Sequence, residues 1–256
     1  MKNEKICLIG CGWLGKPLAL HLIAAGYSVT ATTAHNKSSE FKSDGIPYIQ
    51  FDIASSPEVP DEIINADVLI YTIPPLELTL VKSFFDKIAD DKKILFTTST
   101  SVYGKNLGDV DETFEIKIEQ TNSALLVETE KFLRSRFTNL TIIRPGGLYG
   151  GKRHPIYFLQ GKKDLKTGHE LLHLVHFKDC IKAIETIVKK DIWNETFNLV
   201  SNLSIPKRDY YTTIAAKHSL PLPEYSDLED RMVQTRISNE KSKKLLKIDY
   251  LDPNDY

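Results

Sequence analysis

Lys5-Ile-Cys-Leu-Ile-Gly10-Cys-Gly12-Trp-Leu-Gly15 is the segment from which the rest of this sequence is best interpreted. Its apolar, uncharged run from Ile6 to Ile9 is typical of a strand that is buried on both faces of a sheet. Leucines then recur at helical spacing, at positions 14, 18 and 22. The segment therefore predicts a strand, a glycine turn and a helix in direct succession.

The three glycines of this turn have the spacing Gly-x-Gly-x-x-Gly. Between a strand and a helix, this spacing is a dinucleotide-binding fingerprint. Gly10 permits the tight turn, Gly12 lets the backbone approach a pyrophosphate, and Gly15 lets the helix pack closely on the strand. The start of the helix, with Trp13 and Leu14, offers N–H groups to the phosphates.

The turn has two other interpretations. The residues from Gly10 to Lys16 also fit the pattern G-x-x-x-x-G-K of nucleotide triphosphatases. Pro17, however, stands where that pattern needs a Ser or Thr hydroxyl for magnesium, which disfavours phosphate transfer. The turn could also bind nothing, but the strand and helix around it favour dinucleotide binding.

The overall composition limits the classes of protein. The chain has 256 residues, of which 41% are hydrophobic, and a net charge of −1, so it can form one α/β domain with or without a small lobe. No excess of basic residues favours nucleic acid or an anionic membrane as a partner. No apolar stretch approaches the ~20 residues needed to cross a bilayer.

The cysteines and the absence of a recognisable targeting signal indicate the cellular compartment in which we expect the protein. Cys7, Cys11 and Cys180 have no metal-binding spacing and are typical of packed thiols in a reducing compartment. We therefore expect a cytoplasmic protein with no resident metal. Its expected partner is a small-molecule substrate, and a homodimer is left open.

Strand-like and helical segments alternate along the chain. Further strands are expected at Tyr27–Thr32, Pro47–Ile53, Ala66–Thr72, Lys93–Ser99, Leu140–Arg144, Leu171–His176 and Thr196–Val200. Helices are expected near residues 77–90, 123–136, 179–190, 208–218 and 239–246. This alternation predicts an α/β fold, a Rossmann-type doubly wound parallel sheet with a small C-terminal substrate lobe. Residues 1–150 would form the dinucleotide-binding core, and residues 151–256 mostly the lobe plus returning elements.

The carboxyl ends of parallel strands are where such a fold gathers its ligands. The residues expected there as cofactor contacts are Thr32, Thr33, Asp52, Ile53, Thr72, Ile73 and Pro74. The second strand ends without the Asp or Glu that holds the ribose 2′-hydroxyl of NAD, and Lys37 follows it. The sequence therefore favours NADP over NAD, although Lys37 could equally be a solvated loop residue.

Five stretches of the chain resemble the extended short-chain dehydrogenase/reductases, also called NAD-dependent epimerase/dehydratases. They are Gly10–Gly15, Thr97–Gly104, Arg144-Pro145 with Leu148-Tyr149-Gly150, Leu174–Asp179, and Phe197-Asn198. The Gly-Trp-Leu-Gly-x-Pro variant is most similar to the atypical YeeZ-type subgroup. The resemblance implies an oxidoreductase-like, NAD(P)-binding fold and adds Pro145 to the cofactor contacts. One departure is Ile9, where extended members carry another glycine.

The catalytic residues that the resemblance implies are only partly present. Family members use a Ser that orients the substrate oxygen, a Tyr acid/base and a Lys that lowers the pKa of the Tyr. Ser99 matches the Ser, whereas the Tyr and Lys positions fall on Gln120 and Ala124. Neither an amide nor a methyl group exchanges protons near neutral pH, so the standard acid/base route is missing.

Two hypotheses follow from that gap. Either another group substitutes, or the protein binds NAD(P) as a catalytically inactive redox sensor or regulator. The titratable candidates are Tyr103, Tyr149, His154 and His176, of which Tyr103 is the candidate catalytic group and the two histidines are candidate substrate contacts. Each of the four could instead pack or close a turn. The expected substrate is a small carbonyl or hydroxyl compound, or one like a sugar nucleotide.

His169-Glu170-Leu-Leu-His173 matches the zinc protease pattern H-E-x-x-H. That pattern binds zinc only on a helix, where both histidines share a face. Here it follows Thr167-Gly168 and enters an expected strand, so we predict no metal site.

Overall fold

The computed structural model describes residues 4–35, 41, 43–56, 58–121, 123–226 and 234–256. Its contacts divide the chain into two compact units, each assembled from three separate segments. The first unit comprises Met1–Thr98, Ala124–Ile143 and Ile184–Thr196. The second unit comprises Ser99–Ser123, Arg144–Ala183 and Phe197–Tyr256.

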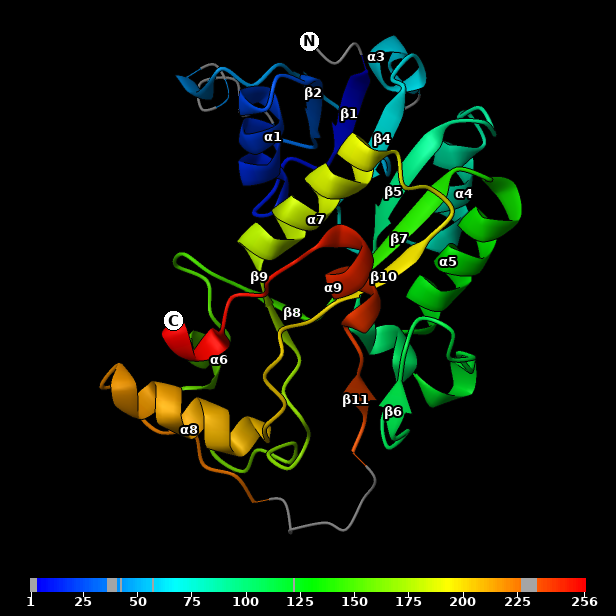
Figure 1. Ribbon diagram of the computed structural model, residues 1–256. Coiled ribbons are helices and arrows are strands. Elements are labelled where there is room, and N and C mark those ends of the chain that lie inside the picture. Colours follow the sequence, from blue (N-terminus) through cyan, green and yellow to red (C-terminus); the bar gives the residue numbers. More distant parts are fainter. Residues whose placement is uncertain (1–3, 36–40, 42, 57, 122, 227–233) are drawn as a thin grey trace. The chain divides into compact units, whose positions relative to one another are not determined.

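One sheet dominates the described structure (Figure 1). Its strands are β1 (Lys5–Ile9), β2 (Ser28–Thr33), β3 (Tyr48–Gln50), β4 (Val68–Tyr71), β5 (Lys93–Thr97), β7 (Leu140–Pro145) and β10 (Thr196–Leu199). Their order is β10-β7-β5-β4-β1-β2-β3, and the neighbours from β3 to β7 pair in parallel. Strands β7 and β10 also run parallel. Ile142 N–H donates to Glu195 C=O and, further along both strands, Gly146 N–H donates to Leu199 C=O. The prediction of a doubly wound parallel sheet is confirmed.

The strand order places β1 at the point where the chain changes direction across the sheet. From β1 the chain builds outward through β2 to β3, and it then returns to the other side of β1 with β4. Cys7 in the middle of β1 accordingly faces Thr30 on one side and Leu69 on the other. Open α/β sheets bind their ligands at the carboxyl ends of the strands at such a switch point.

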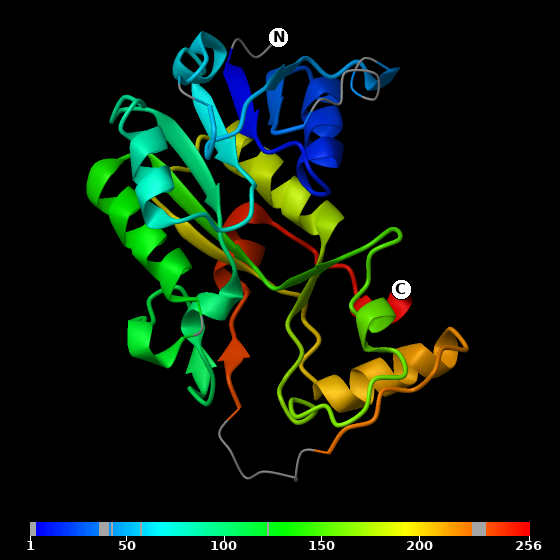
Figure 2. The same ribbon diagram turned by 180° about the vertical axis from the view of Figure 1, so that it is seen from behind.

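Helices cover both faces of this sheet (Figures 1 and 2). They are α1 (Gly15–Ala24), α3 (Asp61–Ile64), α4 (Leu78–Phe85), α5 (Ala124–Arg136) and α7 (Phe177–Lys190). On one face, side chains of α3, α4 and α5 form a buried apolar cluster with alternate residues of the strands, among them Cys7 and Ile9 of β1. On the other face α1 and α7 are joined by His21 Nε2 and Glu185 Oε2, 2.8 Å apart.

The second unit has a core of its own. Strands β8 (Gly147–Tyr149) and β9 (Leu174–His176) pair in parallel, as do β6 (Asp109–Val110) and β11 (Arg236–Ile237). The helices here are η1 (Thr100–Tyr103), η2 (Ile118–Gln120), α6 (Ile156–Leu159), α8 (Lys207–Lys217), α9 (Glu240–Leu246) and η3 (Pro253–Asp255). An apolar cluster centred on Tyr149, Leu172 and Tyr210 is separate from the cluster under the large sheet.

The predicted strands and helices are all present, with ends shifted by a few residues; α4, for example, ends at Phe85 rather than near residue 90. The division of the chain near residue 150 stays a prediction. In the described part of the chain, no helix has both the length and the apolar character that a membrane span requires.

Candidate functional site

The three glycines of the turn after β1 meet different surroundings. Gly10 has a φ of +99°, and a Cβ there would lie 2.2 Å from Ile73 Cγ2. A Cβ on Gly15 would lie 2.1 Å from the carbonyl oxygen of Gly10. At Gly12, by contrast, a Cβ would meet nothing within 4 Å. The fold therefore requires the first and third glycines, whereas Gly12 leaves space beside the backbone, as a closely bound pyrophosphate needs.

Two threonines hold the peptide groups of Gly10. The N–H of Gly10 donates to Thr32 Oγ1 at 3.0 Å. Thr72 Oγ1 donates to the carbonyl oxygen of Gly10 at 2.8 Å. These residues end β2 and follow β4, the two neighbours of β1, so the turn is fixed from both sides. The sequence suggested both threonines as cofactor contacts and gave no sign that their hydroxyls support the turn.

The first turn of α1 provides a suitable environment for an anion. The helix begins at Gly15 after Leu14, with no side chain capping its N–H groups and no acidic residue in its first turn. Such a helix end carries a partial positive charge, although here Lys16 N–H donates to the Gly12 carbonyl oxygen at 2.9 Å and Pro17 has no N–H. Leu14 is buried and Trp13 is half-buried. Together with the space at Gly12, these features fit the pyrophosphate of NAD or NADP.

The remaining predicted cofactor contacts in the first unit lie at the ends of β2, β3 and β4. Thr33 Oγ1 donates to the carbonyl oxygen of His35 at 3.0 Å. Asp52 follows β3, and its carboxylate accepts from Ala54 N–H at 3.0 Å and from Ser55 Oγ at 2.9 Å. Both polar side chains therefore have local partners, and their role toward a cofactor stays a prediction.

The other predicted contacts of the first unit are apolar residues and a candidate for binding the 2′-phosphate. Ile53 and Ile73 pack partly against the apolar cluster under α4. Pro74, after β4, is exposed. Lys37, the proposed partner of a 2′-phosphate, lies outside the described residues.

In the second unit, Ser99 opens a turn rich in hydroxyl groups. Its Oγ accepts from Ser101 N–H at 3.2 Å and so caps η1. Ser123 Oγ donates to Ser101 Oγ at 2.7 Å, and Thr121 Oγ1 donates to the Ser101 carbonyl oxygen at 2.7 Å. We call Ser99, Ser101, Thr121 and Ser123 the hydroxyl cluster. It adjoins the segment in which the resemblance expects a Tyr and a Lys.

Gln120, at the expected Tyr position, packs against the same turn. Gly104 has a φ of +88°, and a Cβ there would lie 2.2 Å from the carbonyl oxygen of Gln120. The Gln120 side chain is exposed, and Ala124 is the first residue of α5. Sequence reasoning did not identify Ser101, Thr121 or Ser123, although the run Thr-Asn-Ser before the helix was a visible signal.

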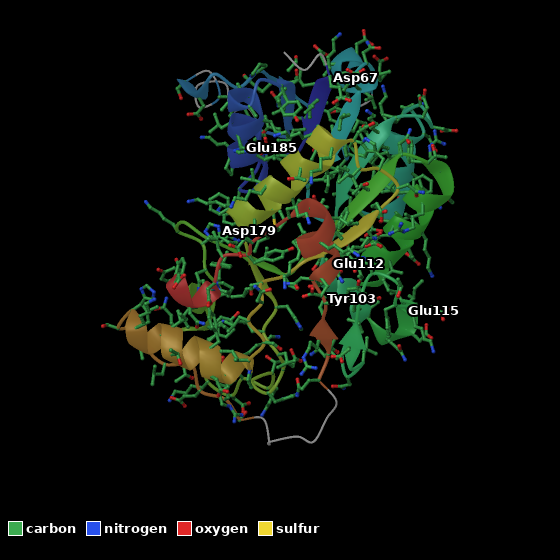
Figure 3. The ribbon with its side chains drawn as sticks, viewed as in Figure 1. Asp67, Tyr103, Glu112, Glu115, Asp179 and Glu185 are labelled. Atoms are coloured by element: carbon green, nitrogen blue, oxygen red, sulfur yellow. The ribbon has the colours of Figure 1, made fainter. Side chains whose placement is uncertain are left out.

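Tyr103 is part of a buried hydrogen-bond network. Its hydroxyl donates to Asn198 Oδ1 at 2.8 Å and accepts from the Arg144 guanidinium at 2.8 Å. The Asn198 N–H donates to Glu112 Oε1 at 2.7 Å, and Figure 3 shows Tyr103 and Glu112 close together. Burial raises the pKa of Tyr103, and Arg144 offsets that effect only in part. This geometry favours a structural role for Tyr103 over the predicted catalytic one.

The two histidines predicted near a substrate also have internal contacts. His154 is fully buried; its Nδ1 accepts from Ile156 N–H at 3.2 Å and its Nε2 lies 3.0 Å from the Tyr210 hydroxyl. His176 is half-buried, and its Nδ1 accepts from Lys178 N–H at the start of α7. Burial lowers the pKa of both rings. The burial of His154 favours packing over substrate contact.

The other residues singled out from the sequence also pack. Pro145 closes β7 and is buried. Tyr149 is buried, and its ring stands edge-on to those of His154 and His176. Burial, followed by the charge of Asp179, raises the pKa of Tyr149, which disfavours proton exchange at neutral pH. Whether these residues touch a ligand stays a prediction.

The residues of the zinc-like pattern do not form a helix. Glu170 instead forms ion pairs with Lys105 and Lys207, at 2.5 and 2.6 Å. His173 directly precedes β9. Within the described ranges, no group of three or more His, Cys, Asp or Glu side chains is arranged to hold a metal ion.

His154→Phe is expected to reduce the acid sensitivity of the fold. Burial, helped by nearby His218, lowers the pKa of His154 from 6.5 to about 4. Between these pH values the unfolded chain binds the proton and the folded chain does not, so the free energy of unfolding falls as the pH falls. This residue accounts for up to about 3 kcal/mol of that loss. The variant loses about 2 kcal/mol at pH 7, because it removes the hydrogen bonds of the ring to Ile156 N–H and to the Tyr210 hydroxyl, but it gains a flatter pH profile.

Urea unfolding at about three pH values from 7.0 to 4.0 measures how the free energy of unfolding of each protein depends on pH. His35→Asn, at an exposed position, serves as the control and should follow the wild-type profile. Equal pH slopes for wild type and His154→Phe would contradict the assignment of His154 as a buried neutral ring.

Comparison with known proteins agrees with this architecture. Residues 5–103 match the family described as the NAD binding domain of 6-phosphogluconate dehydrogenase. The protein YeeZ of Escherichia coli (strain K12) is 29% identical over 245 residues, which cover 89% of this chain and 88% of YeeZ. A functionally unknown conserved protein from Silicibacter pomeroyi DSS has a similar structure, with a TM-score of 0.80 and 18% identity over 98% of this chain and 95% of that one. UDP-glucuronic acid 4-epimerase from Bacillus cereus, in complex with NAD, gives a TM-score of 0.77 and 17% identity over 97% and 92% of the two chains.

The sheet order, the glycine turn and the uncapped start of α1 define an NAD(P)-binding protein of the Rossmann type with an epimerase/dehydratase-like fold. The similarity to YeeZ extends along nearly the whole chain. The chain is homologous to YeeZ and has the fold of the short-chain dehydrogenase/reductases and epimerases. The resemblance expected from the sequence motifs is confirmed.

Proposed function

We propose that this protein is an NAD(P)-dependent, epimerase/dehydratase-like oxidoreductase for a small carbonyl or hydroxyl substrate, or one like a sugar nucleotide. The observation that carries the proposal is the glycine turn, where Thr32 and Thr72 fix both peptide groups of Gly10 and Gly12 leaves open space. The UDP-glucuronic acid 4-epimerase with a similar fold supports the substrate class.

We propose NADP as the preferred cofactor. The last two residues of β2 are Thr32 and Thr33, so this strand end carries no carboxylate to repel a 2′-phosphate. The nicotinamide, when bound, would supply or accept the hydride. In this proposal the backbone around Gly12 and the first turn of α1 hold the pyrophosphate, and Lys37 is a candidate for the 2′-phosphate.

In this proposal protons move through the hydroxyl cluster rather than through a tyrosine. Ser99 would hold the substrate oxygen, as its match to the family's Ser implies. Ser101 and Ser123, 2.7 Å apart between their Oγ atoms, would pass a proton between that oxygen and water. A serine hydroxyl is too weak an acid to hold a negative charge at neutral pH, so these groups act as a relay and not as a base.

A second candidate function is that of a catalytically inactive NADP-binding redox sensor or regulator. The observation that favours it is the environment of Tyr103, whose hydroxyl is occupied by Asn198 and Arg144. With Gln120 and Ala124 at the family's Tyr and Lys positions, this candidate needs no acid/base at all.

Fluorescence titration with NADPH and NADH tests the part that both candidates share. We expect saturable binding of both, tighter for NADPH. If neither binds in the micromolar to millimolar range that is usual for cofactors in cells, both candidates are wrong. If NADH binds more tightly, the NADP preference is wrong and the rest of the proposal stands.

Ser99→Ala separates the enzyme from the sensor. We expect wild-type protein to turn over NAD(P)H with at least one member of a panel of small carbonyl compounds and UDP-sugars. The variant should lose roughly 100-fold in kcat while keeping its NADPH affinity, because Ser99 would act on the substrate and not on the cofactor. Ser135→Ala, an exposed serine on α5, is the matched control. Binding without any turnover would favour the sensor, and turnover unchanged in Ser99→Ala would overturn the role of Ser99.

A further inference from the structure

A polar pocket lies within the second unit, apart from the hydroxyl cluster. It has a volume of about 560 Å³. One wall is the loop from Ser201 to Ser204 after β10, and another is β11 with the start of α9. His173, directly before β9, completes the lining. All the residues that line it are described by the structure.

Two polar side chains in this pocket lack hydrogen-bond partners within the described part of the chain. Ser201 is only 7% exposed, and its Oγ is buried without a partner. The His173 ring also forms no hydrogen bond with the described residues, while its backbone carbonyl accepts from Gly147 N–H. A buried polar group without a partner is costly, so the Ser201 hydroxyl is the group that favours a bound molecule here; the partly exposed His173 ring is a second available hydrogen-bonding group beside it.

The charges around the pocket cancel in pairs. Arg236 binds Asp109 at 2.8 Å, and Lys243 binds Glu240 at 2.9 Å. His173 is neutral at pH 7, because burial, followed by the charge of Lys207, lowers its pKa to about 4. The lining therefore offers no net charge to an ionic ligand.

The chemistry of the two unpartnered groups narrows the ligand further. A neutral imidazole has one donor and one acceptor, and a serine hydroxyl can serve as both. A ligand hydroxyl group can satisfy either of them in either direction. Leu203 and Ile237 add an apolar surface beside these groups, suited to the C–H face of a sugar ring or polyol.

We propose that this pocket binds an uncharged, hydroxyl-rich ligand of the size of a monosaccharide, with Ser201 and His173 as its hydrogen-bond partners. The ligand lies within the second unit and requires no nicotinamide cofactor. The inference is therefore independent of the proposed oxidoreductase activity, and its failure would leave that activity untouched.

The test is a titration of ¹⁵N-labelled protein with D-glucose, without cofactor, followed by amide chemical shifts. We expect saturable shifts of Asn202, Ser204 and Ser238, with a dissociation constant of the order of 1 mM. Ser201→Ala and His173→Phe should each weaken binding about tenfold or more. Ser201→Ala should also leave the melting temperature unchanged or slightly raised, because the hydroxyl has no internal partner to lose. Ser135→Ala is the control for both measurements.

Four results would overturn the proposal. The first is the absence of shifts at these amides up to about 50 mM D-glucose. The second is binding that neither variant weakens. The third is tighter binding of glucose 6-phosphate than of D-glucose at the same amides, which would show that the pocket selects an anion. A fall of more than about 5 °C in the melting temperature of Ser201→Ala would also count against it, because it would show that the hydroxyl stabilises the protein itself.

Discussion

Gly12→Ala is expected to abolish most of the NAD(P)H binding while leaving the protein folded. Gly12 is exposed, and a Cβ there meets nothing within 4 Å, so the folded chain accommodates the methyl group. That open space is where the pyrophosphate of a dinucleotide would approach the backbone, and the methyl group would hold it away from the N–H groups of α1. We expect a loss of at least about 30-fold in NADPH affinity, or roughly 2 kcal/mol.

Gly15→Ala, three residues along the same turn, is expected to behave differently. Its Cβ would lie 2.1 Å from the carbonyl oxygen of Gly10, a backbone atom that cannot move aside cheaply. Helix α1 would have to separate from β1, at a cost of about 3 kcal/mol or more. This variant should lose stability first and cofactor binding as a consequence.

Thermal unfolding and NADPH fluorescence titration, carried out on both variants, distinguish the two effects. The expected pattern is a stable Gly12→Ala that does not bind and a destabilised Gly15→Ala. A stable Gly12→Ala with wild-type affinity would show that no pyrophosphate lies beside this residue, and the cofactor site would have to be sought elsewhere.

Asn198→Ala is expected to produce a large loss of stability. Asn198 is fully buried; its Oδ1 accepts from the Tyr103 hydroxyl and its Nδ2 donates to the Ser238 carbonyl oxygen at 3.2 Å. Truncation removes both bonds, leaves the buried Tyr103 hydroxyl and the partly buried Ser238 carbonyl without these partners, and opens a small cavity. We expect the free energy of unfolding to fall by about 4 kcal/mol.

Tyr103→Phe tests the same hydrogen-bond network by changing the partner of Asn198. It removes only the hydroxyl and keeps the ring over which the Arg144 guanidinium lies, with 5.0 Å between them. We expect a smaller loss of about 2 kcal/mol, and a double variant that loses less than the sum of the two. Urea unfolding measures all three, with the exposed Asn65→Ala as a control expected within 0.5 kcal/mol of wild type. Additive losses would show that Tyr103 and Asn198 do not stabilise the fold through each other.

The large sheet could be predicted from local sequence because each of its strands carries a clear signal. The uncharged run Ile6–Ile9 and the glycines after it predict β1, the turn and α1, and the structure has all three. The ends of the helices were predicted less accurately than their presence. The helix expected to reach residue 90 ends at Phe85, because apolar spacing continues through Ile88 after the regular hydrogen bonding has ended.

The arrangement of the candidate site could not be predicted in the same way. Thr32, Thr72 and Gly10 are distant in sequence, and only the order of the strands reveals that two hydroxyls hold the peptide groups on the two sides of Gly10. Tyr103 and His154 are titratable residue types in suggestive motifs, yet their partners, Asn198 and Tyr210, come from segments far along the chain. Burial of this kind depends on long-range contacts, which a single sequence does not contain.

The threonine contacts at Gly10 also bear on how a cofactor would be received. A flexible loop must lose conformational entropy when it closes around a ligand, and that loss weakens binding. Here the peptide groups on both sides of Gly10 are already ordered by β2 and β4, as part of the sheet itself. The turn is preorganised when the protein folds, so we expect a phosphate group that binds here to cause little further loss of conformational entropy in this turn.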